Sequence, residues 1–278
     1  MMAMEITKTD FENCLAVAVS AQGEVYEKVE PFFASAYDEL QAGVLGDVGT
    51  SAAEGNQHEK LTTAVKQLVA LHAFLSVFRQ LDLVLTPTGF GVVSTNQMAP
   101  ASKQRVDALI GHLRDSYLRT KGLVLEELCK VSGWGATDQA LENIDTLFFD
   151  FRMLQQMQGP AASHLDWQAS QRLISEADEA LRRKISSQYM DHLLNAVRCG
   201  SVSTDDKPII LQCRQIINLW VYGDRETVEL KMRRLLSKLD ADLEKYNIYG
   251  EFGYPVNHHE TFENTKNSPA FVFGGRKH

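Results

Sequence analysis

All but one of the long segments in this 278-residue sequence repeat their apolar residues every three or four positions. Such a repeat places the apolar side chains on one side of a helix, and several such helices bury those sides against one another. The sequence is therefore expected to form a mainly α protein, an antiparallel helical bundle. The repeat predicts helices over residues 10–40, 58–80, 102–130, 140–158, 166–198, 208–222 and 226–246.

Two local signals modify this helical pattern. Pro31 is expected to kink or restart the first helix, because proline lacks a backbone donor and clashes with the preceding turn. Residues 46–57, GDVGTSAAEGNQ, are small and rich in glycine, and are therefore expected to form a mobile loop. The segment 247–278 contains glycine, proline and asparagine, and is expected to form an extended C-terminal tail.

The exception to the helical repeat is the stretch 81–106, LDLVLTPTGFGVVSTNQMAPASKQRV. Two short apolar runs flank Pro87-Thr88-Gly89, which suits a turn with proline at its second position. A β-hairpin inserted near residues 82–94 is therefore expected. An isolated hairpin is only marginally stable in water, so this one either packs on its own helices or augments the sheet of a neighbouring subunit.

The best candidate boundary within the chain is QGPAAS, residues 158–163. It separates a helical half with the inserted hairpin, 1–158, from a helical half with the extended tail, 159–278, although the two can also form a single domain. Apolar positions of the halves align at offsets of 156, 148 and 126 residues along the chain. Duplication produces such a pattern, but amphipathic helices also align whenever their apolar sides are brought into phase, so both explanations stay open.

Composition excludes several classes of partner. The net charge of −8 argues against a surface for nucleic acid, which needs clustered lysine and arginine. The basic runs Arg182-Arg183-Lys184 and Lys231–Arg234 sit among acidic neighbours and are interpreted as solvated faces. No run approaches the roughly 20 apolar residues of a membrane span, and no leader peptide is recognised, so no membrane association is expected. The widely spaced cysteines fit reduced thiols of a cytosolic protein.

The sequence carries few signs of a catalytic or metal site. The sequence contains no HExxH, GxSxG or Walker pattern and no pair of cysteines at metal-ligand spacing. Its densest ligand cluster, His258-His259-Glu260, lies in a polar segment where adjacent histidines are more often solvated than metal-bound. We therefore expect no catalytic residue, no metal and no cofactor. An enzyme with a site assembled from scattered acidic and histidine residues is the third-ranked hypothesis.

The run LDLVLTPTGFGVVSTNQMAPASKQRVDAL resembles a family of uncharacterised proteins of Bacteroides-type tailed phages and prophages, in which an LVLTPTGFGVV hairpin precedes a PASK-RV helix start. The resemblance is sharpest over residues 81–110 and looser through Gly133-Trp134-Gly135 and Leu147–Phe151. It implies a virion structural component of the head–tail connector region, made in the bacterial cytoplasm. The implied partners are other copies of the chain and neighbouring virion proteins. The motif carries no catalytic residue to transfer.

The leading hypothesis is thus a non-enzymatic, oligomer-forming structural protein of a tailed-phage virion. The alternative is a bacterial cytosolic helical scaffold or protein-binding module, which a compact body with an exposed apolar patch would favour. Under the leading hypothesis, the hairpin tip and the tail make the contacts with other subunits. The predicted partner-binding residues are Pro87, Thr88, Gly89, Phe90, Phe271 and Phe273.

Overall fold

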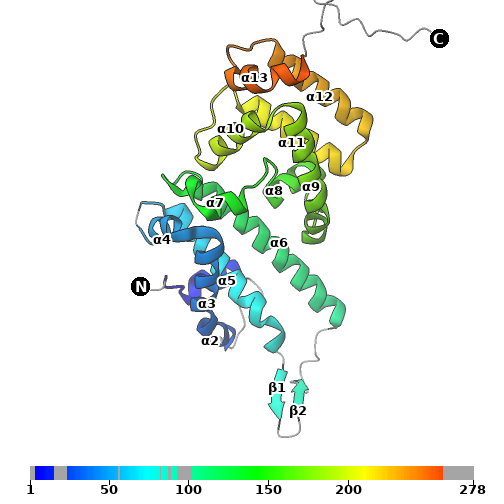
Figure 1. Cartoon of the computed structure of the whole chain (residues 1–278). Helices are drawn as coiled ribbons and strands as arrows, with labels where there is room; N and C mark the ends of the chain where they lie inside the picture. The colour runs from blue at the N-terminus through cyan, green and yellow to red at the C-terminus, as the bar shows by residue number, and fades with distance from the viewer. Residues whose placement is uncertain are drawn as a thin grey trace, which may run out of the picture.

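The computed structural model describes residues 4–15, 24–55, 57–81, 83–86, 89–92 and 102–258. Over these residues the chain is mainly helical, as predicted (Figure 1). The α-helices are α1 (Lys8–Cys14), α2 (Glu24–Val29), α3 (Phe33–Leu40), α4 (Gly46–Glu54), α5 (Glu59–Val77), α6 (Lys103–Leu128), α7 (Asp138–Asn143), α8 (Phe151–Gln158), α9 (His164–Lys184), α10 (Ser187–Arg198), α11 (Lys207–Tyr222), α12 (Arg225–Asp240), α13 (Asn247–Phe252) and α14 (Tyr254–Asn257). Two strands, β1 (Leu83–Thr86) and β2 (Gly89–Val92), lie between α5 and α6.

Helix α5 is the centre of the first half of the chain. It packs against α1, α3, α4 and α6, and most of its apolar side chains are buried in these contacts. Length and composition alone would let the segment Glu59–Gln80 cross a membrane. Its packing against four other helices of the same chain accounts for the apolar composition equally well, because the apolar residues of a core helix are buried against its neighbours.

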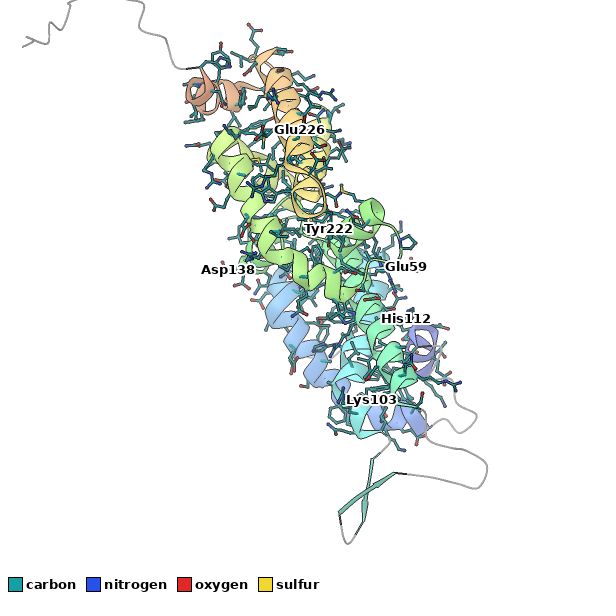
Figure 2. The ribbon with its side chains drawn as sticks, turned by 90° about the vertical axis from the view of Figure 1, so that its right-hand side faces the viewer. Glu59, Lys103, His112, Asp138, Tyr222 and Glu226 are labelled. Carbon is teal, nitrogen blue, oxygen red and sulfur yellow. The ribbon has the colours of Figure 1, made fainter. Side chains whose placement is uncertain are left out.

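In the second half, α11 packs against both α9 and α12, and α10 packs against α13 (Figure 1). The body formed by the two halves is elongated in Figure 2, with Lys103 near the end that carries the strands and Glu226 toward the other end. Helix α6 crosses between the halves, since it contacts α5 on one side and α8 and α9 on the other.

The structure divides the predicted helices at two places and shortens the predicted tail. The first predicted helix is interrupted at Pro31, as expected, by a 3-10 turn between α2 and α3. The single helix predicted over 166–198 breaks between α9 and α10, where the Ser186 hydroxyl accepts a hydrogen bond from the backbone N–H of Tyr189 and starts a new helix. Residues 247–257, predicted as extended tail, form α13 and α14.

The predicted loop at 46–57 is also wrong, because most of it forms α4. The small residues there allow close packing between helices. A Cβ atom added to Gly49, which is buried, would lie 2.8 Å from Cδ2 of Leu128 on α6, closer than carbon atoms approach. The indole Nε1 of Trp134 donates to the carbonyl of Leu45 at 3.0 Å, just before α4 begins. The side of α4 that holds Gly49 therefore faces the protein interior.

A segment between α7 and α8, residues 144–150, interrupts the helix predicted over 140–158 and connects the first half to the second through hydrogen bonds. Its carbonyl groups are bound by arginines from the second half. Nε of Arg198 donates to the carbonyl of Ile144 at 2.8 Å, and Nε of Arg214 donates to that of Leu147 at 2.9 Å. Buried carbonyl groups need such donors, so this connecting segment depends on α10 and α11 for its conformation.

The first helices of the two halves begin in the same way. The Thr7 hydroxyl accepts from the backbone of Asp10, and the Asp10 carboxylate accepts from the backbone of Thr7, a reciprocal cap. Ser163 and Asp166 form the same cap at the start of α9. The two caps are 156 residues apart, which equals the offset at which the first helices align. Duplication of the halves stays a prediction, with which this agreement is consistent.

Candidate functional site

Strands β1 and β2 form an antiparallel two-stranded ribbon. Leu83 pairs with Val92, and the pairing ends at Thr86 opposite Gly89, so two residues connect the strands. Figure 1 shows the ribbon beyond the ends of α5 and α6, pointing away from the helical body. In the described part of the chain the sheet holds these two strands alone, and each strand therefore has one edge without a strand partner.

The register sorts the residues of the ribbon into two faces, because successive residues of a strand alternate between faces. One face holds four large apolar residues, Leu83, Leu85, Phe90 and Val92. The opposite face holds Val84, Thr86, Gly89 and Gly91. The ribbon thus has one strongly apolar face and one face that contains two glycines, where another backbone can approach closely.

The ribbon also lacks the charges that usually protect strand edges from pairing. The sequence contains no Asp, Glu, Lys or Arg between Asp82 and Lys103. An edge of this kind favours the addition of another strand. Of the residues predicted to bind partners, Gly89 and Phe90 lie in β2, opposite Thr86 and Leu85. Pro87, Thr88, Phe271 and Phe273 lie outside the described residues, and the rest of the predicted tail, 259–278, does too.

The helices below the ribbon are joined by polar contacts as well as by packing. His72 is partly exposed on α5, and its Nε2 lies 2.7 Å from Oε2 of Glu39. The same imidazole packs against the ring of Tyr117 on α6, with ring centroids 5.6 Å apart. These contacts connect α3, α5 and α6, so the two helices that carry the ribbon are held to a third.

Three further histidines pair with carboxylates. His164 Nδ1 lies 2.9 Å from Asp115, His192 Nε2 lies 3.3 Å from Asp206, and His258 Nε2 lies 3.1 Å from Asp240. Each pair connects two helices or residues at the ends of helices. His258 belongs to the cluster singled out in the sequence, and its partner is a carboxylate on α12.

The pair of His192 and Asp206 has a serine beside it, but the order of contacts differs from that of a hydrolase. The Ser203 hydroxyl donates to Oδ2 of Asp206 at 2.6 Å, and the Tyr189 hydroxyl donates to Oδ1 at 3.2 Å. A nucleophilic serine needs the histidine as its base, with the carboxylate behind the histidine. Here serine and histidine both bind the carboxylate, which is an arrangement that organises the start of α11.

The cysteines are poor nucleophiles where the structure buries them. Burial raises the pKa of Cys14 to about 11 and the pKa of Cys129 and of Cys213 to about 12. Thiolates, which attack electrophiles and bind metals, are therefore scarce at neutral pH at these positions. Cys199 is exposed. Over the residues that the structure describes, no group of three or more His, Cys, Asp and Glu side chains is placed to hold a metal ion.

One cavity, of about 190 Å³, lies between α6, α9 and the connecting segment. It is lined by Lys121, whose pKa is lowered by burial and whose amine has no ion pair or hydrogen bond with any described residue. Aromatic rings of Phe149 and Trp167 line the same cavity, as does the buried hydroxyl of Thr146. No signal in the sequence marks this cavity, because Lys121 has the spacing of an ordinary surface lysine of a helix.

Residues 31–144 match a protein family described as a family of unknown function, DUF6712. The match begins before α3, ends after α7 and includes the ribbon. Comparisons with curated proteins and with solved structures give no match. The chain is thus similar to this family over less than half of its length, in the part that carries α5, the ribbon and α6.

Proposed function

We propose that this protein is a non-enzymatic structural subunit that works by contacts with other copies of itself and with neighbouring proteins, and that the ribbon is its contact arm. The observation that carries the proposal is the position of the ribbon, beyond the ends of α5 and α6 and away from the body (Figure 1). The resemblance of residues 81–110 extends the proposal to a tailed-phage virion, with a place in the head–tail connector region.

The limited stability of an isolated ribbon favours its contact with another subunit. A two-stranded ribbon by itself is marginal in water, and its apolar face gains most from burial against another surface. Fully burying one Leu, Val or Phe side chain is worth about 1.5–3 kcal/mol, and this face carries four such residues. Two uncharged edges add backbone donors and acceptors that a strand of a neighbouring subunit can pair with.

Replacing residues 84–91 with Gly-Gly tests the arm. We expect the helical circular-dichroism signal and the melting temperature to stay close to those of the wild type, while assembly, measured by native mass spectrometry, is lost. Unfolding of the shortened chain would show that the ribbon belongs to the fold and would refute the arm. Leu85→Asp and Thr86→Asp form a matched pair, since they are neighbours in β1 on opposite faces. We expect the first to weaken assembly more.

Mass spectrometry of purified particles tests the virion assignment separately. Peptides of this chain should be recovered at the copy number of a ring, well below that of a capsid protein. Their absence from intact particles would contradict the virion assignment. The cytosolic scaffold or protein-binding module would then be favoured.

A further inference from the structure

Charge is divided unevenly along the chain. Residues 1–158 contain 20 acidic and 12 basic side chains, whereas residues 159–278 contain 16 of each. The whole net charge of −8 therefore belongs to the first half, and the second half is neutral. Two copies that meet through unlike halves repel one another less than copies that meet through their first halves.

Within the neutral half, one side of α12 is strongly basic. Lys231, Arg234 and Lys238 follow one another at steps of three and four residues, which places them on one side of the helix. We call this set the basic face. Nζ of Lys231 donates to Oε1 of Gln215 on α11 at 3.4 Å, so the basic face borders α11. Helix α11 contains no acidic residue that could neutralise it.

The basic face is without a charge partner in its own chain, as far as the described residues extend. Arg234 and Lys238 have no ion pair or hydrogen bond with any of them. Arg234 is exposed, and Lys231 and Lys238 are partly exposed. The two helices also expose large apolar side chains, Leu211 by 54% and Leu230 by 43%. Cations beside exposed leucines are typical of a surface that docks on an acidic protein partner.

The first half holds a surface of opposite charge. A groove of about 580 Å³ runs between α3, α4 and α7 and is lined by Asp38, Asp47 and Asp138. We call it the acidic groove. No basic side chain is among its described lining residues, and the three carboxylates are exposed. A wide turn of π-helix, Gln41–Leu45, separates α3 from α4 and forms one wall of the groove.

We propose that the basic face of one copy docks on the acidic groove of a second copy, so that subunits associate head to tail. This inference rests on the proposed function and names the two surfaces through which copies meet. Three cations oppose three carboxylates in this contact. The surfaces lie apart along the body, where Figure 2 marks Glu226 on α12 and Asp138 on α7. A contact between unlike surfaces closes into a ring or extends into a filament, as a connector requires.

Charge reversal in the full-length protein tests the contact. One variant carries Lys231→Glu, Arg234→Glu and Lys238→Glu, and a second carries Asp38→Lys, Asp47→Lys and Asp138→Lys. Association is measured by sedimentation velocity at low and high salt, and folding by circular dichroism. We expect each triple variant to associate at least tenfold more weakly than the wild type at low salt. The chain with all six substitutions should associate again.

The control exchanges an ion pair on another surface. Arg172→Glu with Glu176→Arg swaps the exposed pair on α9, where the two side chains lie 3.0 Å apart, and should leave association unchanged. The inference would be overturned if the triple variants associated as strongly as the wild type. It would also be overturned if the variant with all six substitutions did not associate again. If removal of the ribbon abolishes assembly while charge reversal does not, the result supports the proposed function and refutes the contact between the basic face and the acidic groove. A wild type that stays monomeric at all concentrations, alone and with its neighbours, refutes both.

Discussion

Gly122, in the C-terminal half of α6, should be required for full stability although glycine weakens helices. Replacing a helical glycine with alanine normally stabilises by about 1 kcal/mol. Here an added Cβ atom would overlap Oδ1 of Asp150 and lie 2.7 Å from Nε of Arg152. The carboxylate of Asp150 is almost fully buried and is bound by Arg152 Nε at 2.8 Å, and the same guanidinium donates to the Gly122 carbonyl at 2.8 Å. Both partners would have to move.

The expected size follows from these contacts. Breaking a buried ion pair costs about 3–5 kcal/mol, from which the gain in helix propensity subtracts about 1 kcal/mol. We expect Gly122→Ala to lower the free energy of unfolding by about 2–4 kcal/mol. Gly111 on the same helix is the control, because a Cβ there would meet only His164 Cε1 at 3.6 Å, an ordinary contact. Gly111→Ala should be neutral or stabilising.

Urea denaturation, followed by circular dichroism and tryptophan fluorescence, measures both variants against the wild type. The reasoning is refuted if Gly122→Ala is as stable as Gly111→Ala. It is also refuted if the loss is no larger than the few tenths of a kcal/mol typical of exposed positions.

Three further predictions concern caps, thiols and the seam between the halves. Ser163→Ala should lower stability by about 1 kcal/mol at neutral pH. Hydrogen bonds from Ser163 lower the pKa of Asp166. Their contribution to the free energy of unfolding is therefore complete above about pH 4 and is lost as the pH falls through the lowered pKa. The difference between Ser163→Ala and the wild type should accordingly be smaller in unfolding curves at pH 3. Ellman's reagent at pH 8 should modify Cys199 quickly but Cys213 only after unfolding, because Cys213 is fully buried; a fast phase that persists in Cys199→Ser would contradict this. Arg214→Met should lower stability by about 1–3 kcal/mol, since a backbone carbonyl of the connecting segment loses its donor; unchanged urea midpoints would argue against that role.

The helical architecture could be predicted from sequence because each long helix has its own pattern of apolar spacing or its own start signal. Apolar spacing located α5 and α6, and Lys207-Pro208 marked the start of α11. These signals come from residues that are near one another in the sequence, so a single sequence is enough to detect them.

The missed features depend on residues far away in the sequence. Small residues at 46–57 indicate either a loop or close packing of helices, and the choice is made by Leu128 on α6. The row of apolar residues through Leu181, Ile185 and Tyr189 continues across the break at Ser186, so periodicity gave no sign of it. The acidic groove draws its carboxylates from three separate elements, and no reading along the chain brings them together.

The connecting segment at 144–150 has a mechanical consequence. A force applied at the ribbon and resisted at α12 would travel along α6 and pass into the second half both through the contacts of α6 with α9 and through this short segment. Its attachments include the hydrogen bonds from Arg198 and Arg214 to single carbonyl groups. Such bonds break one at a time, whereas packed helices such as α9 and α11 must slide past one another together. Under load, the molecule should therefore yield at this seam while its helices remain intact.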